Sequence, residues 1–165
     1  MRAARVTSAL SRLFLLLLAL LLGAGALAAA EPLPRFSSLR FDRVNLRVGP
    51  GPNFPIEWVL TRRTMPVEVI AEYEAWRRVR DWEGTEGWVR ENSLAGRRTG
   101  IVLGSVRLLY RSAGDLTQVV AQVEPGAIGQ LLGCEGEWCR LDFAGKRGYL
   151  KRGEFWGAYP NETIR

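Results

Sequence analysis

The sequence predicts an all-β protein of two tandem small β-barrels that follow an N-terminal export signal. Three observations lead to this fold class. Residues 76–89 contain an aromatic residue, a turn and a Gly-aromatic-aliphatic triplet, and the same unit returns at 138–150, about sixty residues later. Apolar and polar side chains alternate along short segments that Gly and Pro separate. No stretch after residue 30 has the 3.6-residue period of a long helix.

Residues 1–30 have the pattern of a secretory signal peptide. A basic region with three arginines and no acid precedes a leucine-rich apolar run at 13–22, and alanines at 28–30 supply a cleavage site. A retained transmembrane anchor is the alternative, but the apolar run is shorter than the roughly 20 residues that span a bilayer. We therefore expect cleavage, no stable membrane span afterwards, and a periplasmic or secreted protein.

Export also changes the charge of the chain. The formal net charge is +6 at pH 7, and the sequence has no histidine. Cleavage removes Arg2, Arg5 and Arg12 and no acid, which lowers the net charge to +3. This excess suits an anionic envelope partner, although an ordinary solvated surface explains it equally well. It is too small, on an exported protein, to predict nucleic-acid binding.

Turn residues divide the remaining chain into two units. A Pro-containing leader at 31–40 precedes a first domain at 41–99, a second domain at 100–157 and a polar tail at 158–165. Each domain is expected to hold about five short strands, because an antiparallel sheet of that size protects its edges by curling into a barrel.

The segment 67–73 shows the half-buried strand pattern most clearly. One of its faces is predicted to pack on the core and the other to meet solvent. The core-facing set is Val67, Val69, Ala71 and Tyr73. The solvent-facing set is Glu68 and Glu72.

Cys134 and Cys139 are the only cysteines. If residues 136–137 form a two-residue turn, the cysteines face each other as a non-hydrogen-bonded pair, with Cα atoms about 4.5 Å apart. An oxidising compartment then favours a structural disulfide. A metal site or a redox dithiol is the alternative, but two cysteines without histidine and outside C-x-x-C spacing match neither well. We expect no metal and no cofactor.

Three carboxylates lie near the first hairpin turn, at Asp81, Glu83 and Glu86. An acid pair for glycan cleavage is one interpretation. The simpler one is that these are solvated turn residues, ion-paired to the arginines at 77–80. Since the chain lacks histidine, the usual catalytic triads and histidine metal sites are excluded, and we do not expect an enzyme.

The aromatic residues offer the best ligand site. If Val79 points into the core, two-residue alternation places Trp76 and Trp82 at the surface beside arginines. Exposed aromatic rings next to arginine suit a peptide, glycan or protein ligand. The alternative is that these rings cap the core, which is the preferred interpretation for Trp88. The Pro-Gly loop at 49–55 would form the second wall of the groove. The candidate ligand-binding residues are Trp58, Tyr73, Trp76, Arg78 and Trp82.

The motifs resemble bacterial SH3-like (SH3b) domains. Leu46-Arg47 before a Gly-Pro-Gly loop, Trp-x-x-Val at 76–79 and Gly-Trp-Val at 87–89 follow the family pattern. The second unit resembles it well from Cys134 onward and only loosely before that. The resemblance covers about residues 41–160 and is closest to tandem SH3-like envelope proteins of alphaproteobacteria. It implies a non-catalytic binding module for peptidoglycan or another envelope component. The alternative is a structural or assembly protein that binds only envelope protein partners.

Overall fold

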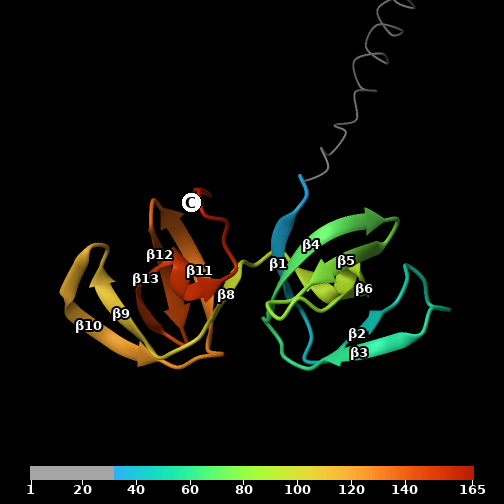
Figure 1. The fold of residues 1–165 in the computed structure, drawn as a ribbon, viewed down its shortest axis with the longest axis horizontal. Helices are drawn as coiled ribbons and strands as arrows, with labels where there is room; N and C mark the ends of the chain where they lie inside the picture. The colour runs from blue at the N-terminus through green and yellow to red at the C-terminus, as the bar shows by residue number, and fades with distance from the viewer. Residues whose placement is uncertain (1–31) are drawn as a thin grey trace, which may run out of the picture. The chain divides into compact units, whose positions relative to one another are not determined.

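The computed structural model describes residues 32–165, so the predicted signal peptide at 1–30 lies outside the described residues. The described chain forms two seven-stranded antiparallel sheets, one for each predicted unit, with two single turns of 3₁₀ helix (Figure 1). The predicted all-β fold class is confirmed. No helix within residues 32–165 is long and apolar enough to cross a membrane.

The first barrel consists of seven strands and the 3₁₀ turn η1 (Glu91–Ser93). The strands are β1 (Arg35–Leu39), β2 (Val44–Arg47), β3 (Ile56–Leu60), β4 (Pro66–Tyr73), β5 (Trp76–Arg80), β6 (Glu86–Arg90) and β7 (Leu94–Ala95). Their spatial order is β3-β2-β6-β5-β4-β1-β7.

The second barrel has the same plan. Its strands are β8 (Thr99–Val102), β9 (Arg107–Ser112), β10 (Asp115–Val123), β11 (Ile128–Glu135), β12 (Trp138–Phe143), β13 (Lys146–Lys151) and β14 (Phe155–Trp156), with η2 (Arg152–Glu154) before the last. Their spatial order is β10-β9-β13-β12-β11-β8-β14. Each strand therefore occupies the place of the strand seven numbers before it, as two copies of one fold require.

Strand β1 lies in the segment predicted as a leader at 31–40, so that prediction differs from the structure. Phe36 and Leu39 are buried, and β1 pairs with both β4 and β7. The two serines obscured this strand in the sequence. Their hydroxyls are satisfied inside the fold, since Ser37 donates to the Ala95 carbonyl (2.8 Å) and Ser38 to that of Arg97 (2.7 Å).

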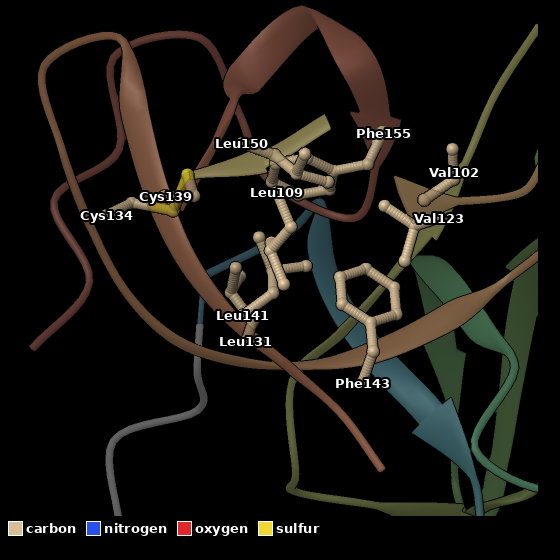
Figure 2. Close-up of a cluster of buried hydrophobic side chains, with 10 residues drawn as sticks. All are labelled: Val102, Leu109, Val123, Leu131, Cys134, Cys139, Leu141, Phe143, Leu150 and Phe155. Atoms are coloured by element: carbon tan, nitrogen blue, oxygen red, sulfur yellow. A yellow bond between two sulfur atoms is a disulfide. The ribbon is translucent and has the colours of Figure 1, made fainter. Parts of the chain in front are cut away.

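Each barrel wraps its own hydrophobic core. The buried cluster of the first is Leu39, Val44, Leu46, Met65, Val67, Val69, Val79, Val89 and Leu94. That of the second, shown in Figure 2, is Val102, Leu109, Val123, Leu131, Cys134, Cys139, Leu141, Phe143, Leu150 and Phe155.

These cores explain the repeated Gly-aromatic-aliphatic triplet. A Cβ atom at Gly87 would lie 2.4 Å from the Cγ of Leu46, and one at Gly148 would lie 2.6 Å from the Cγ of Leu109. Glycine thus leaves space for a core leucine, the aliphatic residue enters the core, and the aromatic residue between them faces outward.

A β-bulge changes the predicted faces of β4. The pairing of β4 with β5 shifts between Val69 and Ala71. Past a bulge, the side chains exchange faces. Tyr73 is therefore 54% exposed rather than core-facing. Glu68 was predicted to face solvent, but it is buried next to Tyr159 of the C-terminal segment.

The disulfide prediction is confirmed. Cys134 pairs with Cys139 and Glu135 with Trp138, so residues 136–137 form the expected turn. The two Cα atoms are 4.1 Å apart and the sulfur atoms are bonded. Both cysteines are buried in the second core (Figure 2).

The C-terminal tail packs against the fold instead of projecting from it. Ile164 forms an antiparallel bridge with Cys134, and the aromatic ring of Tyr159 lies 4.7 Å from that of Phe36 in β1. Tyr159 also donates a hydrogen bond to Glu68 (2.9 Å). The tail of the second barrel thus contacts the first one within the compact unit of residues 32–165.

Candidate functional site

The first barrel has a groove of about 310 Å³ on the outer side of its sheet. Trp76, the first residue of β5, and Pro52 of the Pro-Gly loop both contribute to its lining. The residues that line the groove are Arg43, Val44, Asn45, Arg47, Pro52, Trp76, Arg90 and Ser93.

The groove carries three arginines and no acidic residue in its lining. Within residues 32–165, neither Arg43 nor Arg90 forms an ion pair with a carboxylate. The guanidinium of Arg47 donates to the Phe54 carbonyl (2.6 Å), which holds it against the loop. Guanidinium groups without carboxylate partners bind carboxylate or phosphate oxygens in paired hydrogen bonds. The groove therefore favours an anionic ligand.

Strand register explains how Trp76 enters this site. Trp76 lies opposite Arg90 of the neighbouring strand β6, and the Arg90 guanidinium carbon is 5.1 Å from the centre of the Trp76 ring. This is the geometry of a cation–π contact. Arg47 lies opposite Trp88 on the other side of β6. Basic and aromatic side chains from three strands thus lie next to one another.

Trp76 is 6% exposed, and it lies outside the hydrophobic cluster of the first barrel. Trp76 was predicted to be exposed at the surface, and this prediction was wrong, because Arg90 covers the ring. Trp82 also differs from its prediction. Strand β5 ends at Arg80, so alternation stops there, and Trp82 packs in the turn against the first core.

The remaining predicted site residues lie elsewhere. Trp58 and Tyr73 are 58% and 54% exposed, and neither lines this groove. Arg78 is exposed and forms an ion pair with Glu86 (2.8 Å). Of the five candidate residues, Trp76 alone lines the groove.

Sequence reasoning missed most of the polar residues in the groove, above all Arg43, Asn45, Arg90 and Ser93. Arg43 directly precedes β2, Asn45 belongs to β2, Arg90 ends β6 and Ser93 ends η1, so only the strand pairing places them together. One signal was present in the sequence. Arg47 belongs to the Leu-Arg motif, and Trp76 opens the Trp-x-x-Val motif of the same barrel.

The carboxylates near the first hairpin have structural roles. Asp81 is buried and accepts hydrogen bonds from the backbone amides of Glu83 (2.9 Å) and Thr85 (2.8 Å), which fixes the turn. Gly84 in the same turn has a positive φ of 89°, which glycine adopts without strain. Glu86 pairs with Arg78 and Arg80. Within residues 32–165, no three His, Cys, Asp or Glu side chains gather as a metal site.

Solved structures with some similarity to the chain include the NlpC2 and NlpC1 proteins of Trichomonas vaginalis. They are 13% and 14% identical to it, each with a TM-score of 0.36, and the matches cover 79% of this chain. An NlpC/P60 family protein of Bacillus cereus is 12% identical, with a TM-score of 0.34 over 74% of this chain. The chain spans about half the length of these proteins (50%, 49% and 57%). No curated protein has detectable sequence similarity to it.

The family model for the bacterial SH3 domain matches the chain twice, at residues 41–96 and 106–157. The two matches fall on the two seven-stranded sheets, which repeat the same strand order. The chain therefore belongs to the bacterial SH3 domain family, with two such domains in tandem.

Proposed function

We propose that this protein is an exported, non-catalytic binding module that recognises an anionic component of the bacterial cell envelope, with peptidoglycan as the first candidate. One observation carries the proposal: three arginines and no acid line the first-barrel groove, and the buried Trp76 ring supports one of them, Arg90, by a cation–π contact. Peptidoglycan presents carboxylates on its peptide stems, which suit paired bonds from guanidinium groups.

Two further features support an envelope location. The sequence begins with the pattern of an export signal, and the disulfide of the second barrel is typical of oxidising compartments. The family also supports binding rather than catalysis, since small SH3-like barrels act through surface grooves. Fold alone does not specify the ligand, so the identity of the ligand rests on the groove residues.

Sedimentation with purified cell-wall sacculi tests the proposal, with protein purified after export of the full chain. The key variant is Arg43→Gln with Arg90→Gln, which removes two charges from the groove. The matched control is Arg63→Gln with Arg111→Gln, which removes two charges from exposed positions outside it. We expect the wild type and the control to sediment with sacculi and the groove variant to lose roughly tenfold in affinity.

Two outcomes would contradict the proposal. Equal loss in both variants would show that binding reflects overall charge, and raising the salt concentration should then abolish it in the same way for each protein. Absence of binding by the wild type would remove peptidoglycan as the ligand.

A second candidate function is assembly through protein partners alone. The exposed apolar side chains of the edge strand β3 favour it, since Ile56, Trp58 and Val59 are 46%, 58% and 38% exposed. Exposed apolar residues on an edge strand, which has one side without a partner strand, offer a surface for another chain. Trp58→Ala would then abolish capture of an envelope protein while sacculus binding stayed absent in the wild type.

A further inference from the structure

The second barrel has a groove of its own, about 480 Å³ in volume, with a different chemistry. Its aromatic lining is Trp138 of β12 and Tyr149 of β13, accompanied by Arg140. On one side stands Ala113, in the turn between β9 and β10. On another side stand the residues 163–165 of the C-terminal segment. Among the described residues, the lining of the first groove has no counterpart to that last wall.

Strand register relates this groove to the first one. Trp138 lies opposite Lys151, as Trp76 lies opposite Arg90. Tyr110 lies opposite Tyr149, in the place where the first barrel has Arg47 opposite Trp88. An arginine of the first groove is thus replaced by a tyrosine.

This replacement makes the second face aromatic. The Tyr110 ring packs edge-on against Trp138, with the ring centres 6.0 Å apart, and the Lys151 amine lies 5.7 Å from the Trp138 ring. All three rings are partly exposed. Partly exposed aromatic rings with fixed orientation form a platform on which a flat apolar surface stacks.

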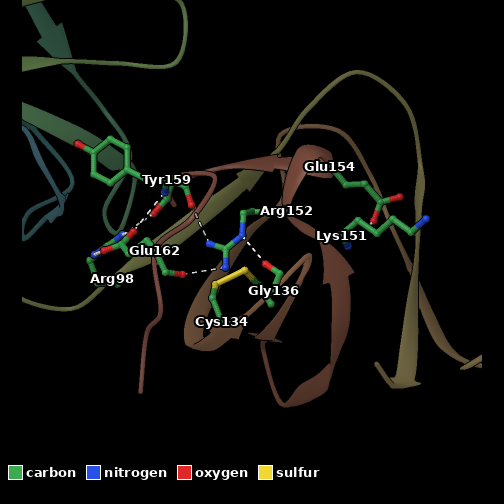
Figure 3. The surroundings of a disulfide bond; sticks show 10 residues. Arg98, Cys134, Gly136, Lys151, Arg152, Glu154, Tyr159 and Glu162 are labelled. Carbon is green, nitrogen blue, oxygen red and sulfur yellow. Dashed lines mark hydrogen bonds and ion pairs between the residues drawn. A yellow bond between two sulfur atoms is a disulfide. The ribbon is translucent and has the colours of Figure 1, made fainter. Parts of the chain in front are cut away.

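The wall formed by the C-terminal segment is held in place. The Ile164 amide donates to the Cys134 carbonyl (3.1 Å), and the Cys134 amide donates to the Ile164 carbonyl (2.9 Å). The Arg152 guanidinium donates to the carbonyl groups of Tyr159, Glu162 and Gly136 at 2.8, 2.8 and 2.9 Å (Figure 3). It therefore joins the segment to the disulfide hairpin.

The polar side chains of the groove carry both signs of charge. Arg140 and Arg165 line it together with Glu135, and Thr163 adds a hydroxyl. The first groove, in contrast, has three cations and no acid. A strongly anionic ligand therefore suits the second groove less well than an uncharged one that has many hydrogen-bonding groups.

We propose that the second barrel is a separate carbohydrate site, in which a pyranose ring stacks on Trp138 and Tyr149. A sugar ring has an apolar C–H face and a polar edge, which matches an aromatic floor with a polar rim. Arg140, Glu135 and Thr163 donate to and accept from its hydroxyl or amide groups. This inference rests on the proposed envelope-binding function in one respect only, the choice of N-acetylglucosamine as the sugar of the probe.

The test is a titration of the purified, exported protein with a soluble tetramer of β-1,4-linked N-acetylglucosamine. The signals of the tryptophan indole N–H groups are followed by NMR. We expect the Trp138 signal to shift saturably while that of Trp76 stays in place. Trp138→Ala should weaken binding roughly tenfold, as truncation of a central aromatic contact does. Trp58→Ala, the matched control at an exposed tryptophan that lines neither groove, should bind normally.

Two gentler variants keep the test valid if Trp138→Ala fails to fold. Arg140→Ala changes an exposed side chain of the rim. Ile164→Pro removes the amide that pairs with Cys134 and so releases the wall. Each should weaken sugar binding several-fold.

Three outcomes would overturn the inference: no saturable shift, a shift confined to Trp76, or unchanged affinity in both gentler variants. An acidic stem peptide that shifts Trp138 when the sugar does not would also overturn it. Failure here is distinguishable from failure of the proposed function, because sacculus binding depends on Arg43 and Arg90 of the first barrel.

Discussion

The two barrels share one strand order and secure the same hairpin by different chemistry. In the first barrel, Glu72 of β4 lies opposite Arg77 of β5, with the Nε–Oε1 distance at 3.1 Å. In the second, Cys134 of β11 lies opposite Cys139 of β12 and is bonded to it. Both pairs lie one step further from the turn than the pair that contains the tryptophan, Tyr73–Trp76 in the first barrel and Glu135–Trp138 in the second. The two barrels thus carry different cross-strand links at the same position, an ion pair in one and a disulfide in the other.

The neighbours of the two links explain this difference. Glu72 also binds Arg35 of β1, and Arg77 also binds Glu91 of η1 (2.8 Å), so the first link belongs to a charge network that solvent reaches. Cys134 and Cys139 are 3% and 0% exposed. An isolated ion pair buried to that degree would lose more in desolvation than it gains, whereas a disulfide has no charge to desolvate.

The grooves differ in the same manner. Both are built around the tryptophan that opens the second strand of the hairpin, so the fold places an aromatic ring at the same point in each barrel. The residues around it differ, since Arg43, Arg47 and Arg90 line the first groove, whereas Tyr149, Arg140 and Glu135 line the second. One fold thus presents two different groove chemistries.

The largest expected effect comes from adding one methyl group where the strands pack on the core. A Cβ at Gly148 would lie 2.6 Å from both the Leu109 Cγ and the Tyr110 carbonyl oxygen. Gly148→Ala should lower the free energy of unfolding by about 3 kcal/mol, the upper end for overpacking. Denaturant unfolding measures this loss.

Gly87→Ala sharpens the comparison. Its Cβ would lie 2.4 Å from the Leu46 side chain and 3.0 Å from the Arg47 carbonyl oxygen, so a side chain takes up more of the strain. We expect a loss of about 1–2 kcal/mol. Gly153→Ala, where no atom lies within 4 Å, is the control and should change little. Equal losses at Gly87 and Gly148 would contradict this account.

The next effect separates the two hairpin links. Cys134→Ala with Cys139→Ala should lower the free energy of unfolding by about 2 kcal/mol, the value for a short closed loop. Glu72→Gln removes the first-barrel link and should cost less than about 1 kcal/mol, because solvent screens that pair. Denaturant unfolding of both variants checks the order, and a costlier Glu72→Gln would refute it.

The features of this fold that depend on residues close together in the chain could be predicted from the sequence. Hairpin turns and the disulfide register are such features, and these predictions are confirmed. Alternation identified the strands but assigned several side chains, among them Glu68, Tyr73 and Trp76, to the wrong face or exposure. Strand β1 was missed because its partners β4 and β7 lie far along the chain.

The site depends on long-range geometry, which is why little of it was predicted. The local sequence around Tyr73 does not indicate the bulge that precedes it, since a bulge is defined by the pairing with the partner strand. The groove likewise joins Arg43 and Arg90, which are separated by most of the first barrel. The parts of the groove identified from the sequence were the tryptophan of the repeated hairpin and the Pro-Gly loop, of which Pro52 lines the groove.

A smaller effect tests the contact between the barrels. Tyr159 donates to Glu68 at 2.9 Å, and burial followed by this hydrogen bond raises the pKa of the Tyr159 hydroxyl well above its ordinary value. Tyr159→Phe leaves a buried carboxylate oxygen without this donor and should cost about 1.5 kcal/mol. Tyr73→Phe, at an exposed ring, should cost nothing measurable in the same unfolding experiment. Similar values for the two would show that the contact adds no stability.

The smallest effect is a dependence of the C-terminal segment on pH. The hydrogen bond from Arg98 holds the pKa of Glu162 below its ordinary value of 4.5 (Figure 3). A carboxylate with a lowered folded pKa stabilises the docked state above its ordinary pKa, and this contribution is lost as the pH falls through the folded value. Hydrogen exchange of the Ile164 amide should therefore accelerate between pH 7 and about 3, relative to that of a core amide such as Val89.

Glu162→Gln should remove most of this acceleration, since the glutamine side chain cannot change its charge. The first barrel has no such segment, so its exchange pattern should not follow the titration of Glu162. An acceleration that persists in Glu162→Gln would assign the pH dependence to another carboxylate of the second barrel, such as Asp142, whose pKa the Arg147 hydrogen bond also lowers.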